Sequence, residues 1–250
     1  MIVYLDTEST GIDDDDQIIQ IGIIDIDGNV LLNTLVQCDK ESHPKALEVH
    51  GITPDMLKDA PTYPEIHDKI VSLLHNKVVE AYNAPFDMRL LTQTAKCHQL
   101  DFDDCHWKAR CIMRRFAETF DCKRQKQFVA AERLGVTFDD LKLHDAADDC
   151  ELTRRVSLAL NKVIAKFEKE EARAAKTKEY RQRARQRIEA AMIPANWAEF
   201  PYFGQANRPE GCKTLSKLRV MDLDNYEYAG QCCDTYGNAG HLFMPKKTSE

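Results

Sequence analysis

The sequence of 250 residues lacks the features that mark membrane-spanning and repetitive proteins. It contains no run of about 18 apolar residues, which is the length that a membrane-spanning helix needs. We also find no internal repeat and no long low-complexity segment. No basic region precedes the apolar stretch at its beginning, so we expect no secretory signal. Hydrophobic residues make up 43% and charged residues 30% of the chain, which is typical of a globular protein that does not act at a membrane.

A disulfide framework is missing as well. The nine cysteines are an odd number without framework spacing, so we interpret them mostly as free thiols in a reducing cytoplasm. Two groups of cysteine and histidine are conceivable zinc sites, but one has no compact ligand spacing and the other depends on adjacent cysteines. The first group is Cys97, His98, Cys105, His106, Cys111 and Cys122, and the second is Cys212, Cys232, Cys233 and His241. We therefore favour an interpretation without zinc.

The net charge of −7 is distributed unevenly along the chain. Residues 1–161 carry −11, residues 162–187 carry +6, and residues 188–250 carry −2. The composition of 162–192 predicts a long, exposed, net-basic helix. We therefore expect a main domain over 1–161, this charged helix, and a small C-terminal extension over 193–250. An acidic body with a basic segment is compatible with a nucleic-acid enzyme, although a solvated helix has the same composition.

The most informative stretch is 1–11, where a strand-like apolar run ends in two acids. Successive side chains of a strand point to opposite faces, so Asp6 and Glu8 share one face. Neighbouring carboxylates repel each other unless a cation lies between them, and hard divalent cations prefer oxygen ligands. On these residues alone, a metal site and an ordinary strand with an acidic end both remain open. The acidic run Asp13–Asp16 predicts a solvated turn, which we favour over a separate metal site.

Strands and helices alternate through the rest of the first 161 residues. The strands predicted over 17–26 and 30–37 are joined by Asp27-Gly28-Asn29, a strong hairpin signal. With the first strand they predict an antiparallel meander. Apolar spacing and stop residues predict a short strand over 78–82 and helices over 63–76, 88–95, 110–120 and 126–134.

Two further acids stand near the start of predicted helices. Asp87 follows Asn83-Ala84-Pro85-Phe86, where a strand gives way to a helix, and such junctions often carry functional side chains. Asp149 lies five residues after His144 in a segment that opens another helix. The position of Leu152 relative to Asp149 places this acid toward the core side of its helix. A lone histidine near a helix start is more often a capping or surface residue, so the wider pattern has to decide its role.

Together these sites resemble the three motifs of the DnaQ-like, DEDDh 3′–5′ exonucleases. Asp6-Thr7-Glu8-Ser9-Thr10-Gly11 resembles the first motif, Asn83–Asp87 the second, and His144 with Asp149 the third. The tyrosine subclass has Tyr where this chain has Asp145, so the histidine subclass is favoured. The resemblance covers roughly residues 1–160. Two departures stand out, because many relatives have Glu where this chain has Gln20 and His where it has Tyr82.

The resemblance implies a ribonuclease-H-like α/β fold with a mixed five-stranded sheet flanked by helices. It also implies two Mg²⁺ ions, with Mn²⁺ as a substitute, held by Asp6, Glu8, Asp87 and Asp149. Asp6 would bridge the ions, and His144 would be the general base for the attacking water. The implied substrate contacts are Thr7, Ser9, Thr10, Asn83 and Phe86. The expected product is a nucleoside 5′-monophosphate released from a 3′ end.

The substrate remains open at this stage. Single-stranded DNA or a 3′ overhang is favoured, because the first motif and the His50-Gly51-Ile52 region look more like the DNA-acting members. RNA is the alternative, as in exoribonucleases of the RNase T and oligoribonuclease type. A polymerase or another replication or repair partner, and a homodimer, are compatible with the family. The rival classes are an inactive nucleic-acid-binding protein, which the intact acids argue against, and a zinc-binding interaction module, which rests only on scattered cysteines.

Overall fold

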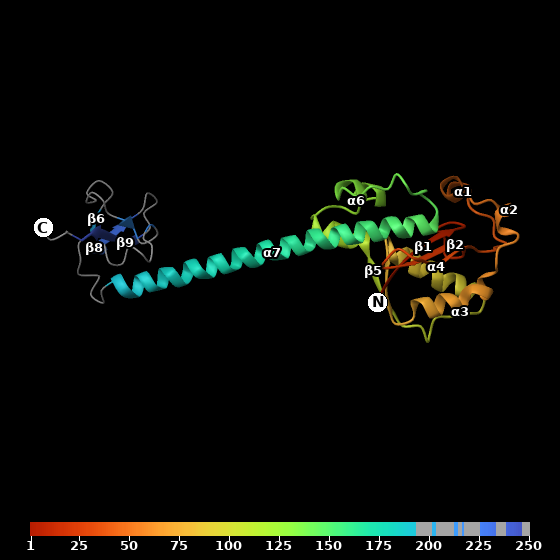
Figure 1. Ribbon diagram of the computed structural model, residues 1–250, viewed down its shortest axis with the longest axis horizontal. Helices are drawn as coiled ribbons and strands as arrows, with labels where there is room; N and C mark the ends of the chain where they lie inside the picture. Colours follow the sequence, from red (N-terminus) through yellow and green to blue (C-terminus); the bar gives the residue numbers. More distant parts are fainter. Residues whose placement is uncertain (194–201, 204–212, 215–216, 218–225, 234–238, 247–250) are drawn as a thin grey trace. The chain divides into compact units, whose positions relative to one another are not determined.

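The computed structural model describes residues 1–193, 202–203, 213–214, 217, 226–233 and 239–246. The chain divides into two compact units, Met1–Lys166 and Phe167–Glu250. Each unit contains one β-sheet, as Figure 1 shows. Within the described residues, none of the helices combines the length and the apolar character that crossing a lipid bilayer requires.

The first unit is built on a mixed five-stranded sheet in the order β3-β2-β1-β4-β5. In its centre, β1 (Ile2–Ser9) runs antiparallel to β2 (Ile18–Asp25) and parallel to β4 (Lys77–Ala81). β3 (Val30–Leu35) is antiparallel to β2, and β5 (Trp107–Cys111) is parallel to β4. These pairings confirm the predicted meander and the predicted fold class.

Helices cover both faces of this sheet, so its central strands carry apolar residues on both sides. α3 (Tyr63–Leu74) and α4 (Ala84–Cys97) pack on the face that holds Val3 and Leu5 of β1. On the other face, Tyr4 of β1 packs against Cys150 of α7 (Ala146–Met192). Since strand residues alternate between faces, Asp6 and Glu8 lie on the α7 side with Tyr4, and Thr7 lies on the α4 side.

The remaining helices complete these layers. α5 (Ile112–Thr119) and α6 (Gln127–Arg133) share a second core with α7, centred on buried side chains such as Phe116 and Val156. The short helices α1 (Pro44–His50) and α2 (Pro54–Leu57) follow β3. Their positions in the first unit can be followed in Figure 1.

The structure changes three of the predicted elements. Residues 107–111 form the edge strand β5, so the predicted helix 110–120 begins at Ile112. The helix predicted over 88–95 begins at Ala84, which places Asp87 in its first turn. The core helix that was expected after His144 and the charged helix over 162–192 are one continuous helix, α7. Neither Gly nor Pro occurs between its ends, so nothing in the local sequence interrupts it.

The second unit contains a four-stranded sheet in the order β6-β8-β9-β7. Its two longer strands, β8 (Tyr226–Cys233) and β9 (Ala239–Pro245), pair antiparallel over their length. The short strands β6 (Tyr202–Phe203) and β7 (Lys213–Thr214) flank them. Tyr228 packs edge-on against the fully buried Phe243, which gives this sheet a small core of its own.

Candidate active site

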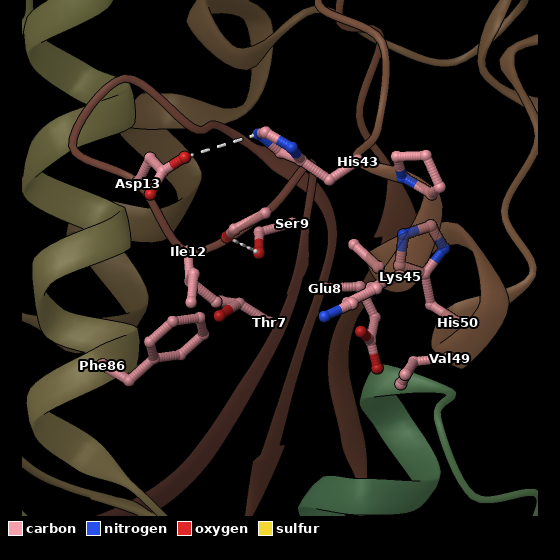
Figure 2. A pocket seen from close by; sticks show the side chains of 13 residues that line it. Thr7, Glu8, Ser9, Ile12, Asp13, His43, Lys45, Val49, His50 and Phe86 are labelled. Atoms are coloured by element: carbon pink, nitrogen blue, oxygen red, sulfur yellow. Dashed lines mark hydrogen bonds and ion pairs between the residues drawn. The ribbon is translucent and has the colours of Figure 1, made fainter.

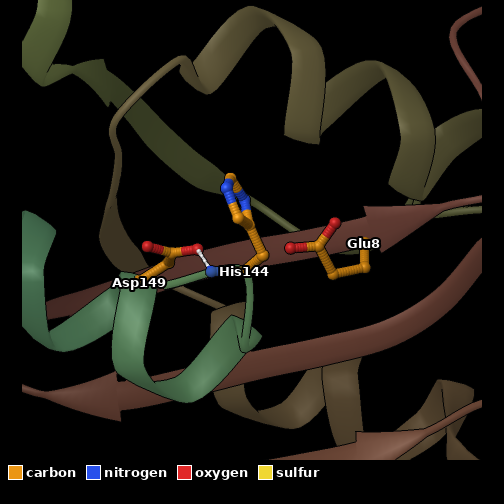
Figure 3. Close-up of side chains that lie close together, drawn as sticks. All are labelled: Glu8, His144 and Asp149. Carbon is orange, nitrogen blue, oxygen red and sulfur yellow. Dashed lines mark hydrogen bonds between the residues drawn. The ribbon is translucent and has the colours of Figure 1, made fainter. Parts of the chain in front are cut away.

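Four carboxylates and a histidine gather where β1 approaches its carboxyl end. Asp6 and Glu8 project from β1, Asp87 comes from the first turn of α4, and Asp149 comes from the first turn of α7. Carboxylate oxygens of Glu8 and Asp149 and a ring nitrogen of His144 all lie within 4.8 Å of one another. Figure 3 shows the imidazole of His144 between these two carboxylates. Asp6 lies close enough to Asp87, Asp149 and Glu8 for their charges to act on it.

The turn before α7 fixes the relation between His144 and Asp149. The His144 backbone is left-handed, with φ of 67°, which is uncommon for a residue that carries a side chain. In this conformation its N–H donates a hydrogen bond to Oδ2 of Asp149 at 2.9 Å. The imidazole itself remains exposed. Strained backbone of this kind is concentrated at functional sites, and here it places an exposed imidazole beside a buried carboxylate.

Thr7 orients the acid from α4. Its hydroxyl donates a hydrogen bond of 2.9 Å to Oδ1 of Asp87, and both side chains are buried. The bond links Thr7 to the acidic cluster, although Thr7 and the two acids of β1 lie on opposite faces of the strand. The motif residue Thr7 therefore holds a carboxylate in place as well as lining the cavity described below.

The site is electrostatically unfavourable without a cation. Burial raises the pKa of Asp6 well above its ordinary range, and the neighbouring carboxylates raise it further. Burial, followed by the charge of Asp149, raises the pKa of Glu8 to about 8. Burial also raises the pKa of Asp149 and raises that of Asp87 to about 7. Within the described residues, no Lys or Arg pairs with these four acids, so an all-oxygen, anionic donor set is left that fits hard divalent cations.

We expect the free energy of unfolding of the metal-free protein to fall as the pH rises from about 4 to about 8. The folded state keeps protons on Glu8 and Asp87 up to about 8 and about 7, whereas the unfolded chain releases them near 4.5 and 3.8. The unfolded state therefore binds fewer protons in this window, and stability falls with rising pH. Thermal unfolding in EDTA at about pH 5 and about pH 8 measures this, and Mg²⁺ should restore stability at the higher pH.

The Asp6→Asn variant isolates the contribution of the site from that of other titrating groups. It removes one repelling carboxylate, so its melting temperature in EDTA should exceed that of the unaltered protein by several degrees at about pH 8, and by less at about pH 5. A difference that is constant with pH, or one of opposite sign, would show that the carboxylates do not repel one another in the folded protein.

Gln20 and Gly22 of β2 hold the start of α7 against the sheet. The buried Gln20 amide donates to Oδ2 of Asp145 at 3.1 Å and accepts from the Ala146 N–H at 3.4 Å. A Cβ atom on Gly22 would lie 2.5 Å from the Ala146 carbonyl, so only glycine permits this close approach. The sequence showed Gln20 only as a departure from the relatives. The structure makes it a positioning residue for the segment 144–149.

Gln20→Ala is expected to lower the nuclease rate by about 10- to 100-fold, as is typical when a group that orients metal-site residues is lost. Asn33→Ala is the matched control, because Asn33 accepts a 3.4 Å hydrogen bond from the same amide nitrogen that donates to Asp145 but belongs to β3 and not to the segment 144–149. Circular dichroism would verify that both variants are folded. Equal rates for the two variants would show that the contact with α7 does not matter for catalysis.

A cavity of about 700 Å³ opens beside Glu8. Thr7, Ser9 and Phe86, three of the predicted substrate contacts, line it together with residues that were not among the predicted contacts. Figure 2 shows these added side chains, which are Ile12, Asp13, His43, Lys45, Val49 and His50. Ile12 and Val49 are apolar but 76% and 53% exposed, so the cavity offers unsatisfied apolar surface beside acidic and basic groups.

Two predicted contacts lie elsewhere. Thr10 is fully buried, and its hydroxyl donates to Oδ1 of Asp16 at 2.7 Å, so we no longer include it among substrate contacts. Asn83 is exposed at the start of α4 and does not line the cavity.

The acidic turn after β1 is only partly solvated. Asp13, Asp14 and Asp15 are exposed as expected, but Asp16 is fully buried, and the prediction is wrong for this residue. Asp16 is held by an ion pair of 2.9 Å with Lys40 in addition to its hydrogen bond with Thr10. Asp13, Asp16 and His43 lie within ligand distance of one another, but Lys40 already neutralises the Asp16 carboxylate. We therefore do not propose a metal site at Asp13, Asp16 and His43.

The zinc alternative finds no support where the structure describes its residues. Between Cys97 and Cys122, no three cysteine, histidine or acidic side chains come within ligand distance of one another. His98 instead stacks on Tyr63, and Cys105 is buried in the core. Cys212 of the second proposed group lies outside the described residues.

Known proteins that resemble this chain include an exonuclease and a DNA polymerase subunit. The RNase_T family model, described as Exonuclease, matches residues 3–156. The uncharacterized exonuclease CP81 of Escherichia phage 186 is 37% identical over 171 residues, which cover 64% of this chain and 88% of that protein. The DNA polymerase III subunit epsilon of Pasteurella multocida is 25% identical over 63% of this chain and 67% of that subunit.

Solved structures match a similar share of the chain. Exonuclease X, in complex with 5′ overhanging duplex DNA, is 25% identical, and the match has a TM-score of 0.51 and covers 64% of this chain and 90% of that one. The nuclease domain of 3′hExo, a DEDDh family member bound to rAMP, is 16% identical to this chain, with a TM-score of 0.55. The match covers 64% of this chain and 91% of that domain, and at this identity it shows a similar fold alone. With its fold, its three motifs and a family match over most of the first unit, this chain belongs to the RNase_T family of DnaQ-like exonucleases.

Proposed function

We propose that this protein is a metal-dependent 3′–5′ exonuclease that releases nucleoside 5′-monophosphates. The observation that carries the proposal is the convergence of Glu8, His144 and Asp149 within 4.8 Å, beside Asp6 and Asp87. An inactive binding protein would gain nothing from buried carboxylates that repel one another and lack a basic partner. The proposal therefore follows from the chemistry of the site together with the family.

The acids would hold two divalent cations, which we propose to be Mg²⁺. Asp6, Glu8, Asp87 and Asp149 would be their ligands, and Thr7 would hold the Asp87 carboxylate in place for this role. When bound, two such ions stabilise the charge on the attacking and leaving oxygens of a phosphodiester. Hydrogen bonds to Asp87 and Asp149 fix these two carboxylates before any ion binds.

The protein side chains would bind the 3′-terminal nucleotide and move one proton. The cavity beside Glu8 is large enough for a nucleotide, and Ile12, Val49 and Phe86 offer apolar surface to a base. Lys45 in the same cavity supplies a cation for a phosphate. His144, exposed next to Glu8 and Asp149, would take the proton from the attacking water as the phosphodiester bond breaks.

We propose single-stranded DNA, or a 3′ overhang on duplex DNA, as the substrate. Support comes from relatives whose names connect them with DNA, namely the polymerase III subunit epsilon and exonuclease X solved with overhanging duplex DNA. The second candidate is RNA, because the DEDDh nuclease domain of 3′hExo was solved with the ribonucleotide rAMP.

We also propose a replication polymerase as the partner to test first, because the chain is similar in sequence to a DNA polymerase III subunit.

The experiment compares single strands of DNA and RNA that are labelled at the 3′ or the 5′ end, in Mg²⁺ and in EDTA. We expect the 3′ label to be released first as a mononucleotide, and the 5′-labelled strand to shorten progressively, only in Mg²⁺. The strand that is degraded faster identifies the substrate class. Release from the 5′ end, or equal degradation in EDTA, would contradict the proposal.

A further inference from the structure

The second half of α7 presents charge to solvent on every turn. From Lys166 to Gln182 every residue is exposed, and the side chains are mostly those of Lys, Arg, Glu, Gln and Ala. These residue types favour a helix without help from packing. Long side chains of both charges cover the helix, so their arrangement around it decides what surface the segment offers.

The basic residues are concentrated on one face. Lys169, Arg173, Lys176, Tyr180 and Arg183 follow one another at alternating steps of four and three residues. At 3.6 residues per turn these positions fall within an arc of about 80°. We call these five residues the basic stripe. In the sequence, the same spacing continues toward the N-terminus through Lys166 and Lys162.

No acid interrupts the basic stripe. Glu168, Glu170, Glu171 and Glu179 all fall outside its arc. Arg183 pairs with Glu179 at 2.6 Å, but Lys169, Arg173 and Lys176 take part in none of the ion pairs found among the described residues. The three cations are therefore available to a partner, and they are not needed to stabilise the helix.

Tyr180 stands among these cations. Its side chain is 70% exposed, although a large aromatic ring is stabilised by burial and not by contact with water. Cations that alternate with an exposed aromatic ring are the combination that binds single-stranded nucleic acid, because phosphates meet the charges and a base stacks on the ring. The opposite face of the helix carries Glu171, Lys178 and Gln182 and has no continuous apolar surface for a membrane or a coiled-coil partner.

We propose that the basic stripe of α7 binds the backbone of a single-stranded nucleic acid, with Tyr180 stacking on a base. The inference rests on the proposed function, because the strand would be the one whose 3′ end enters the active site. It adds a second contact surface outside the exonuclease fold that the family match covers, since that match ends at residue 156.

The test compares two triple variants of the full chain that lose the same charge. The stripe variant is Lys169→Gln, Arg173→Gln and Lys176→Gln, and the control variant is Lys178→Gln, Arg181→Gln and Arg185→Gln, whose positions lie on other faces of the same helix. Fluorescence anisotropy would measure binding to a labelled strand of about 30 nucleotides in EDTA over a range of salt concentrations, with DNA and RNA in parallel.

We expect the stripe variant to bind the strand about 10- to 100-fold more weakly at about 0.1 M salt. The steepness with which the logarithm of the binding constant falls with the logarithm of the salt concentration should decrease by about 2, as the loss of three phosphate contacts predicts. The control variant should lose much less. Equal weakening in both variants would show that only net charge matters and would overturn the proposal, as would unchanged binding of the stripe variant. DNA and RNA should respond alike, since the contact is to phosphate.

Two further measurements separate this proposal from its premise and test the ring. The p-nitrophenyl ester of thymidine 5′-monophosphate has no strand to lie along a helix, so both triple variants should hydrolyse it at the unaltered rate in Mg²⁺. If the unaltered protein neither hydrolyses this ester nor degrades strands, the proposed function fails, whereas the binding comparison still decides the role of the basic stripe.

The role of the aromatic ring is tested by two further variants. Tyr180→Ala should weaken single-strand binding about 5-fold or more, and Tyr180→Phe should retain it. Equal binding of these two variants would show that the ring does not contact the strand.

Discussion

Asp149→Ala is expected to reduce metal-dependent nuclease activity by about 10³-fold or more, because losing even a single hydrogen-bond donor that stabilises transition-state charge costs about 10²–10³-fold. Asp149 is buried in the first turn of α7, beside Glu8 and His144, and the His144 N–H holds its carboxylate in position. A smaller side chain cannot reach an ion at this place. The measurement is the initial rate of strand shortening with saturating Mg²⁺.

The variant should remain folded, which distinguishes loss of chemistry from loss of structure. Burial raises the pKa of Asp149, so removing its carboxylate relieves a cost in the metal-free protein. Asp148→Ala is the matched control, because the neighbouring acid accepts a hydrogen bond from the Lys142 N–H outside the cluster. Asp148→Ala should retain most of the activity. Full activity of pure Asp149→Ala would remove this residue from the active site.

The sequence predicts the central part of the fold because its signals there are local. A strand that ends in Asp6 and Glu8, and a hairpin at Asp27-Gly28-Asn29, each follow from residues within a few positions of one another. The resemblance to the family supplied what periodicity alone does not, namely that Asp87 and Asp149 belong to the same site. The structure places both acids beside β1, each at the start of a helix.

Other features depend on contacts between distant segments and could not be predicted. β5 is a short edge strand that exists through its pairing with β4, and its own sequence continues into a helix without a break. Asp16 is buried because Lys40 and Thr10 meet its carboxylate, although its sequence context is a run of acids. Gln20 matters because Asp145 and Ala146 lie next to it in space. Apart from Thr10, the partners of these residues lie in segments that are distant in the sequence, so local patterns do not predict the contacts.

His144→Ala is expected to slow strand cleavage by about 10²–10⁴-fold, which is the usual contribution of a general base. The imidazole is exposed and lies within 4.8 Å of ligand atoms of Glu8 and Asp149, so it can reach a water molecule that approaches the acids. The rate constant under saturating Mg²⁺ and substrate is the measurement. His106→Ala, which removes an exposed histidine near β5, should leave this rate unchanged.

A rescue experiment separates a base from a merely structural histidine. Free imidazole should restore part of the rate of His144→Ala, because the vacated position is open to solvent. The backbone N–H of residue 144 still donates to Asp149 in the variant, so metal binding, measured by the Mg²⁺-dependent rise in melting temperature, should persist. An unchanged rate in His144→Ala would mean that another group accepts the proton.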